Sequence, residues 1–378
     1  MKIEPFLTEQ FFTDYEFSAP YLLASSDCET MSIEELLSLS GSHLEAFGQV
    51  TLGYTESQGN PLLREQISEM YDSVSAEDVV VLTSPVEGIY LAMQSLLEAN
   101  DEVIALRPAY DALNNVARHL CRQVVPWDLV PTENGWELNL EHLATRIGPQ
   151  TKMVVVNFPH NPTGFVPTPD QWKRLVELVR QHDTWLFCDE IYRGLEFETP
   201  IPSAADVYRN SIVLGGLSKT YGLPGLRAGW LIIQDAQLRD ELINWKHYTT
   251  ICPAAPTEFL AGQALQVRQQ LADRSKEIIR SNLNCACAFF GEFPDLFVWR
   301  PPSAGSVAFV ELNLPKLGFE SATQYCHHLA QQHGIVLLPG KCLGFEDRFV
   351  RFGLGRKSFE TSLQAYAKVV SPQASEGG

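Results

Sequence analysis

The feature that most constrains the fold is an alternation, from about residue 60 onward, of short apolar runs with segments of helical spacing. Segments that contain these apolar runs lie at 79–82, 102–106, 152–157, 185–188, 211–214 and 228–232. The helical segments between them lie at 62–71, 88–98, 109–118 and 169–181. Because a run without polar alternation has both faces buried, this pattern predicts an α/β fold with a mainly parallel sheet covered by helices. Ligands of such sheets bind beyond the carboxyl ends of the strands.

The chain is long enough to form more than one lobe, since 378 residues exceed the size at which a single core usually stops growing. We expect a large domain at 46–265 and a small α+β domain at 266–378, with strands near 307–310 and 349–352. Residues 1–45 are expected to form an arm that belongs in part to the small domain, with a helix from about residue 31 capped by Ser32 or Thr30.

Charge and composition restrict the partners. The net charge of −18 disfavours nucleic acid, whose phosphates an acidic protein repels. No apolar stretch approaches the roughly 18 residues that span a bilayer, and no signal-like start is present, so a soluble, cytoplasmic protein without a membrane partner is expected. The eight cysteines form no C-x-x-C pair, so we expect reduced core residues and no metal site.

The strongest chemical signal follows the apolar run at 211–214. A glycine-rich turn presents Lys219, and Arg227 follows eight residues later, before the next run. A lysine beside a buried strand is costly unless it has a partner or a chemical role. One such role is Schiff-base formation, which needs an amine whose pKa lies below the usual value of about 10.4. Taken alone, an incidental lysine on a surface turn is the commoner explanation.

Two further signals also follow strands. Asp189 ends the run at 185–188, and Tyr192 comes three residues later. Asn161 lies in the turn 157–164, which prolines and a glycine define. Each has an ordinary explanation by itself, because an Asp after a strand often caps a helix and Asn is common in loops.

Together these signals resemble the class I/II aminotransferases of fold type I, which depend on pyridoxal 5'-phosphate (PLP). The matching segments cover nearly the whole chain and are 54–64, 84–88, 108–110, 161–164, 189–192, 218–227 and 349–351. The resemblance implies a central, mostly parallel sheet of seven-stranded type flanked by helices, with a smaller α+β domain beside it. It also implies PLP as cofactor.

The resemblance implies a role for each matching residue around the ring of PLP. Lys219 would form the Schiff base and then act as the base that moves the substrate proton. Asp189 would pair with the protonated ring nitrogen. Asn161 and Tyr192 would hydrogen-bond the ring hydroxyl, and Tyr110 would stack on the ring, although a simple core position suits Tyr110 equally well.

The resemblance also implies a phosphate site and a substrate anchor. The phosphate would be held by residues that flank a helix start and the lysine turn, namely Ser84, Pro85, Val86, Ser218 and Arg227. Tyr54 would reach the phosphate of a neighbouring subunit, which implies a homodimer with shared active sites. Arg351, with Asn161, would bind the substrate α-carboxylate; the alternative for Arg351 is an ion pair with Asp347 or Glu346.

Two positions depart from the family pattern. Gly216 stands where many members have a serine that touches the phosphate, and Pro85 has no N–H to offer. These departures concern cofactor affinity more than cofactor identity. The segments 21–30 and 245–250 resemble a less characterised branch, some members of which oxidise or cyclise guanidino amino acids.

The sequence therefore predicts an aminotransferase that acts on an α-amino acid and a 2-oxo acid. The nearest alternative is other PLP chemistry on the same fold, namely oxidation or hydroxylation, cyclisation or elimination. A more remote alternative is the effector-sensing domain of a regulator, which the acidic charge and the absence of a basic DNA-binding segment disfavour. The side chain of the substrate cannot be read from these motifs.

Overall fold

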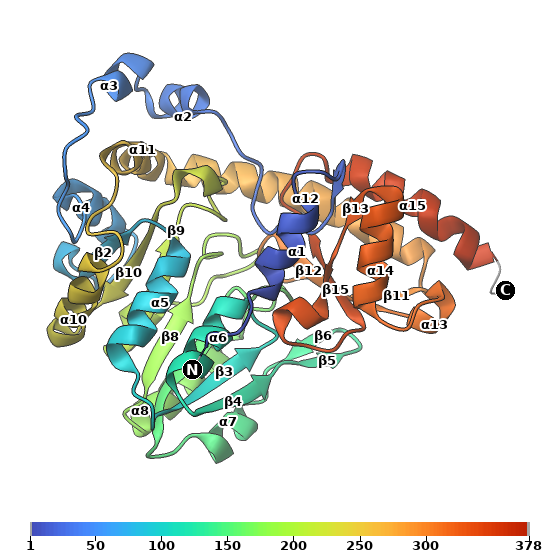
Figure 1. Cartoon of the computed structure of the whole chain (residues 1–378), viewed down its shortest axis with the longest axis horizontal. Helices are drawn as coiled ribbons and strands as arrows, with labels where there is room; N and C mark the ends of the chain where they lie inside the picture. Colours follow the sequence, from blue (N-terminus) through green and yellow to red (C-terminus); the bar gives the residue numbers. More distant parts are fainter. Residues whose placement is uncertain (1, 376–378) are drawn as a thin grey trace.

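The computed structural model describes residues 2–375, and its larger lobe is built on a seven-stranded sheet (Figure 1). The strand order is β2 (Val79–Leu82), β10 (Gly229–Ile233), β9 (Ser211–Gly216), β8 (Trp185–Asp189), β7 (Thr151–Asn157), β3 (Glu102–Arg107) and β4 (Gln123–Asp128). Only β10 runs antiparallel to its neighbours, and the remaining pairs are parallel. The predicted fold class, a mostly parallel sheet flanked by helices, is confirmed.

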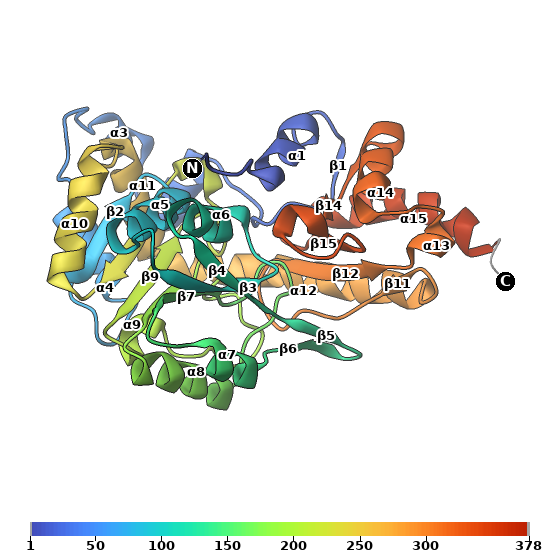
Figure 2. The same cartoon turned by 60° about the horizontal axis from the view of Figure 1, so that its bottom comes forward.

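Helices cover both faces of this sheet, as the continuous apolar strands require. One face packs against α5 (Pro85–Leu96), α6 (Asp111–Leu120) and α10 (Ala236–His247). The other packs against α4 (Pro61–Ser68), α7 (Leu140–Arg146), α8 (Pro169–Gln181), α9 (Ala204–Val207) and α11 (Ala255–Gln266). Figure 2 shows α5 and α6 above the strands and α7, α8 and α9 below them.

The sequence did not predict the edge strand β4 or the small hairpin of β5 (Val130–Thr132) and β6 (Gly135–Glu137). In β4 only Trp127 is buried, and Pro126 lies within it. Proline is tolerated there because β4 is an edge strand with one unpaired side. A strand of this kind lacks the continuous apolar run by which the inner strands were predicted.

The smaller lobe is an antiparallel sheet in the order β11 (Phe297–Val298), β12 (Val307–Leu312), β15 (Phe349–Gly353) and β14 (Leu338–Pro339). It packs with α14 (Ala322–His328) and α15 (Phe359–Ser375). The 25-residue helix α12 (Arg268–Glu292) runs across both lobes (Figure 1). Its first part contributes to the core of the large lobe and its later part to the core of the small lobe, so it fixes one lobe against the other.

The N-terminal arm contacts both lobes in turn. Helix α1 (Leu7–Tyr15) packs on the small lobe, and β1 (Tyr21–Leu22) pairs in parallel with β13 (Ile335–Val336). Helices α2 (Ile33–Ser40) and α3 (Leu44–Gly48) lie against the large lobe, where Leu36 and Leu37 enter its core. Ser32 caps α2 in a full capping box with Glu35, as the sequence predicted.

One close approach fixes the arm beside the end of β15. A Cβ atom at Gly353 would overlap the carbonyl oxygen of Ser25, so only glycine allows the two backbones to lie so near. The amide of Gly353 donates to the carbonyl of Leu23. The segment 25–27 is thereby held at the junction of the two lobes. Within the described range, 2–375, no helix is long and apolar enough to span a bilayer.

Candidate active site

A cavity of about 370 Å³ lies between the lobes, beyond the carboxyl ends of β7, β8 and β9. The structure brings most of the predicted site residues together around it: Pro85, Val86, Tyr110, Asn161, Asp189, Tyr192, Ser218, Lys219, Arg227 and Arg351. Ser84 and Tyr54 do not line it. This position agrees with the rule that open α/β sheets bind ligands at the carboxyl ends of their strands.

Lys219 follows β9, and its side chain points into the cavity, where its Nζ donates to Ser26 Oγ at 2.7 Å. Burial lowers the pKa of the Lys219 ammonium, and the positive charge of Arg351 lowers it further, against the opposite influence of Asp27. A lowered pKa enlarges the fraction of neutral amine near neutral pH. A neutral amine is the form that can attack a carbonyl carbon.

Asp189 is the last residue of β8 and is almost fully buried. Its Oδ1 accepts the N–H of Ile191 at 3.0 Å. Burial raises the pKa of this carboxyl from 3.8 to about 7, although the Ile191 N–H and the charge of Lys219 act in the opposite direction. A buried carboxyl of this kind favours a cationic partner, because such a partner compensates the cost of ionising it away from water.

Arg351 lies in β15 and is 1% exposed. Its guanidinium donates to the carbonyl of Ala24 and, through Nη1 at 3.2 Å, to Asn161 Oδ1. No carboxylate lies within ion-pair distance of Arg351 in the part of the chain that the structure describes. Asp347 instead accepts from Thr323, and Glu346 pairs with Arg348, so the alternative ion pairs are not formed. A buried cation without a counter-ion favours an anionic ligand.

Tyr192 adds a second incomplete polar group. Its side chain is 2% exposed, and its hydroxyl has no hydrogen-bond partner among residues 2–375. Buried hydroxyls are nearly always satisfied, so this one indicates a ligand atom in the cavity. Tyr110 lies nearby, with its hydroxyl donating to Glu9 Oε1 at 2.9 Å.

The start of α5 and the turn at Arg227 form another side of the cavity. Ser84 is the N-cap of α5, and its Oγ accepts the N–H of Glu87 at 3.4 Å. Arg227 adopts φ 51°, a left-handed conformation that costs a non-glycine residue roughly 1–2 kcal/mol. Its exposed guanidinium donates to the carbonyl of Pro224 and has further N–H groups available. A helix N-terminus and a free guanidinium together suit a phosphate.

The structure explains the two departures from the family pattern as one packing feature. A Cβ atom at Gly216 would lie 2.7 Å from Cγ of Pro85, and one at Gly229 would lie 2.9 Å from the same ring. The proline ring, together with Cδ1 of Ile191 at 2.9 Å, therefore occupies the space that a side chain at position 216 would need. Pro85 and Gly216 are complementary, and a serine at 216 does not fit while the proline is present.

Tyr54 lies far from the cavity of its own chain and is 91% exposed. Its segment contacts residues 247–253: Thr55 Oγ1 donates to the carbonyl of Pro253, and Ser57 Oγ lies 3.1 Å from His247 Nε2. Thr249 and Thr250 in turn donate to Glu87 in the first turn of α5. The segment of the exposed Tyr54 is thus linked by hydrogen bonds, through residues 247–253, to the first turn of α5, which borders the cavity.

Sequence reasoning missed the contribution of the N-terminal arm. The arm lines the cavity with Thr8, Glu9, Phe12, Glu16, Ser25, Ser26 and Asp27. No motif marks these residues, because they reach the site through the pairing of β1 with β13 and the backbone contact of Leu23 with Gly353, some 300 residues away in sequence. The seven-residue spacing of Glu9 and Glu16, two helical turns, was the one available signal.

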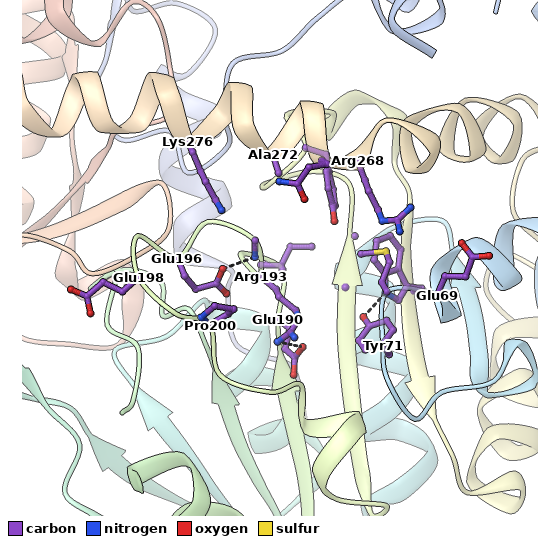
Figure 3. Close-up of a pocket in the computed structure, with 18 residues that line it drawn as sticks. Glu69, Tyr71, Glu190, Arg193, Glu196, Glu198, Pro200, Arg268, Ala272 and Lys276 are labelled. Atoms are coloured by element: carbon purple, nitrogen blue, oxygen red, sulfur yellow. Dashed lines mark hydrogen bonds and ion pairs between the residues drawn. The ribbon is translucent and has the colours of Figure 1, made fainter. Parts of the chain in front are cut away.

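A second cavity of about 390 Å³ lies between α12 and the turns that follow β8 and β9 (Figure 3). Two cations extend into it from α12, Lys276 on the side of Arg193 and Glu196 and Arg268 on the side of Glu69 and Tyr71. Two of its acids are engaged: Glu190 lies 3.7 Å from Arg193 and accepts from Ser203, and Glu196 accepts the N–H of Gly194. The charges here stabilise the turn after Asp189.

Comparisons with known proteins identify the family of the chain. Residues 22–362 match the family model for aminotransferase class I and II. The chain is 27% identical to capreomycidine synthase of Streptomyces vinaceus over 97% of this chain and 94% of that protein. It is 30% identical to the arginine–pyruvate transaminase AruH of Pseudomonas aeruginosa, over 77% of this chain and 75% of that one.

Solved structures extend the likeness to the whole fold. A PLP-dependent aminotransferase from Streptococcus suis superposes with a TM-score of 0.91 at 31% identity, covering 98% of this chain and 99% of the other. The PLP-dependent cyclase OrfR gives a TM-score of 0.90 at 25% identity, covering 99% and 98%. The predictions of family, fold and PLP cofactor are confirmed. This chain is a member of the class I and II aminotransferase family.

Proposed function

We propose that this chain is an aminotransferase that uses PLP to move the amino group of an α-amino acid to a 2-oxo acid. The main support for this proposal is that Lys219, Asp189 and Arg351 line one cavity. It combines an amine of lowered pKa, a carboxyl of raised pKa and a buried guanidinium without a carboxylate partner. These are the groups needed to hold PLP and the α-carboxylate of an amino acid.

The residues present fit the cofactor. The unpartnered hydroxyl of Tyr192 and the amide of Asn161 would hold the ring hydroxyl, and Asp189 would hold the ring nitrogen in its protonated form. The start of α5, with Pro85 and Val86, together with Ser218 and Arg227, would hold the phosphate. Because Pro85 has no N–H, Arg227 would carry a larger share of the phosphate affinity.

When bound, PLP supplies a carbonyl carbon that takes the amino group and a cationic ring that withdraws electrons from the substrate Cα. The protein positions the substrate and moves its proton. Arg351 would bind the α-carboxylate through two parallel N–H donors and so fix the orientation of Cα. Lys219 Nζ, once released by the substrate amine, would take the proton from Cα. Its hydrogen bond to Ser26 holds Nζ on the cavity side of the turn.

Other chemistry on the same scaffold is the second candidate. It is favoured by the similarity to capreomycidine synthase and to the cyclase OrfR, whose names describe ring-forming or synthetic reactions. The two candidates differ in what happens after the amino group has been bound. A transaminase retains the amino group until an oxo acid arrives. An oxidase, with O2 as oxidant, or a lyase releases oxo product and ammonia without an oxo acid, and a cyclase forms a ring product without one.

The test is to mix the purified, PLP-loaded protein with a panel of amino acids and to follow the visible absorption of the cofactor. A transaminase is expected to lose the band stoichiometrically and to regain it on addition of a 2-oxo acid. Release of ammonia without an added oxo acid would contradict transamination and support the second candidate. The Lys219→Ala variant is expected to lose the band of the lysine-bound cofactor; an unchanged band would overturn the site assignment.

We further propose that the protein is a homodimer whose active sites are shared. Support comes from large apolar side chains exposed around Tyr54, namely Leu52 at 84%, Leu62 at 70%, Tyr248 at 82% and Ile251 at 48%. Such an exposed group is typical of an interface. It is connected to the α5 side of the cavity through the Thr249 and Thr250 contacts to Glu87.

Subunit mixing tests the shared site. Tyr54→Ala and Lys219→Ala homodimers are each expected to be impaired. A hybrid pairs one Tyr54→Ala subunit with one Lys219→Ala subunit. The cavity of its Tyr54→Ala subunit keeps its own Lys219 and receives an intact Tyr54 from the other subunit, so the hybrid is expected to regain activity. Failure of well-formed hybrids to regain any activity would contradict the sharing of active sites.

We also propose a cytoplasmic location, which the eight free cysteines support.

A further inference from the structure

Helix α1 brings two carboxylates to the cavity. Glu9 and Glu16 both line it, and Phe12 lies between them on the same side of the helix. The helix is anchored at its start, where the amide of Thr8 donates to Asp111 at 2.8 Å and its hydroxyl donates to the carbonyl of Cys342 at 3.1 Å. The first contact is to the large lobe and the second to the small lobe, so the carboxylates are held at the junction.

The charges of the cavity can be assigned one by one. Under the proposed function, Arg227 meets the cofactor phosphate, Arg351 meets the substrate carboxylate and Asp189 meets the ring nitrogen. Asp27 already forms an ion pair with Arg356 at 2.5 Å. These assignments use every other charged group of the cavity lining except Lys219, which must lose its proton to react.

Glu9 and Glu16 are left without a cation. Among residues 2–375, no Lys or Arg nitrogen lies within ion-pair distance of either carboxylate. Burial raises the pKa of the half-buried Glu16, and the negative charges of Asp27 and Glu9 raise it further. The repulsion among these groups would be relieved by a positive charge placed between them.

A second observation indicates that the cavity holds ligands and that the substrate lies next to α1. Arg351 is 1% exposed and lacks a carboxylate partner, and the buried hydroxyl of Tyr192 lacks any partner within residues 2–375. Both line the same cavity as Glu9 and Glu16. The guanidinium carbon of Arg351 lies 5.8 Å from the centre of the Phe12 ring, so the anchor for the α-carboxylate lies next to the acidic face of α1.

We propose that the amino-acid substrate carries a positively charged side chain, a guanidinium or an ammonium, which Glu9 and Glu16 bind. The inference rests on the proposed function, because Arg351 must hold the α-carboxylate for the side chain to reach α1. A planar guanidinium can donate to two carboxylates at once, and the ring of Phe12 offers it an apolar and cation-binding surface.

The test compares L-arginine with L-citrulline, which has the same length and shape but a neutral ureido group. L-Lysine, L-glutamine and L-leucine complete the panel. The rate of the first half-reaction, read from loss of the cofactor band, is expected to favour the cationic substrates by roughly 10²-fold, the effect of losing a charged hydrogen-bonded pair. Lysine measured beside arginine separates an ammonium from a guanidinium.

Variants then assign the effect to α1. Glu16→Gln and Glu9→Gln keep the shape of each side chain, and the amide oxygen that Glu9→Gln introduces can still accept from the Tyr110 hydroxyl. Each is expected to lower the arginine preference roughly tenfold, and the double variant to abolish it. The matched control is Asp14→Asn, which removes one charge from an exposed position of the same helix outside the cavity lining and should leave the preference intact.

A binding measurement gives a readout that does not depend on turnover. Arginine lacking its α-amino group cannot react, and calorimetry is expected to show that the loaded protein binds it more tightly than the corresponding citrulline derivative. This difference should disappear in the Glu9→Gln, Glu16→Gln double variant.

The outcomes separate this inference from the proposed function. If citrulline, glutamine or leucine change the cofactor band as fast as arginine, the aminotransferase function stands and the cationic-substrate inference is wrong. A preference that persists in the double variant also overturns the role of Glu9 and Glu16. If no amino acid changes the band of a PLP-loaded protein, the proposed function fails and this inference fails with it.

Discussion

Replacing Asp189 by asparagine should make the apoprotein more stable and should weaken its binding of PLP. The carboxyl is buried at the end of β8, and burial raises its pKa from 3.8 to about 7. In the unfolded chain the same carboxyl titrates near its ordinary value. Between about pH 4 and 7 the folded state therefore binds more protons than the unfolded state, and the stability of the wild-type apoprotein falls as pH rises through this range.

The size of the effect follows from that interval. It spans about three pH units, and each is equivalent to 1.36 kcal/mol, so ionised Asp189 costs the apoprotein about 4 kcal/mol above pH 7. The neutral amide of the Asp189→Asn variant avoids this cost, and its oxygen can still accept the Ile191 N–H that Asp189 accepts at 3.0 Å. With PLP bound the sign reverses, because the protonated ring nitrogen needs a negative partner. Loss of that partner should weaken PLP binding roughly 10²- to 10³-fold.

Urea unfolding of both apoproteins at one protein concentration measures the stability difference. The variant is expected to be more stable by about 4 kcal/mol at pH 8, and the gain should be less than half as large at pH 5. Asp14→Asn, at an exposed position, serves as the control and should show no such gain. A gain that is the same at both pH values, or a variant less stable than wild type at pH 8, would refute the reasoning.

Two further predictions concern the cofactor and substrate anchors. Gly216→Ser should destabilise the protein by about 1–3 kcal/mol through clashes with the Pro85 ring and Ile191. Adding Pro85→Ala should recover part of that loss in a double-mutant cycle, and additive effects would show that the two positions are not coupled. Arg351→Lys should raise KM for the amino acid roughly 10- to 100-fold and leave the cofactor band unchanged, since only the bidentate carboxylate contact is lost. Arg348→Lys, an exposed position in the turn just before the same strand, should leave KM unchanged.

The inner strands of the sheet could be predicted because burial on both faces leaves a direct trace in the sequence. Every strand of the large sheet except β4 coincides with a continuous apolar run. Strand direction leaves no such trace, so the antiparallel β10 could not be distinguished from its parallel neighbours. β4 was missed because an edge strand need not be apolar, and Gln123 and Pro126 are tolerated there.

The residues around the ring of PLP were accessible to sequence reasoning for a related reason. Lys219, Asp189 and Asn161 each lie at or just beyond the end of a strand of one sheet, so the position of the strand fixes the position of the side chain. The complementarity of Gly216 and Pro85 was not accessible, because the two residues are more than 100 positions apart and meet only when α5 packs on β9. In the sequence they appear as two separate defects of the phosphate site.

The acidic side of the cavity depends on contacts that cross the whole chain. Glu9, Glu16 and Ser26 reach the site because β1 pairs with β13 and because the arm lies against Gly353. The sheet of the large lobe thus positions the groups that hold the cofactor, while the arm positions the groups that we assign to the substrate side chain. Substitutions on α1 should then change which amino acid reacts without changing the cofactor band, whereas substitutions at the strand ends should change both. Because the two sets of residues are carried by separate elements, substrate preference in this fold can vary with the arm while the catalytic groups stay fixed.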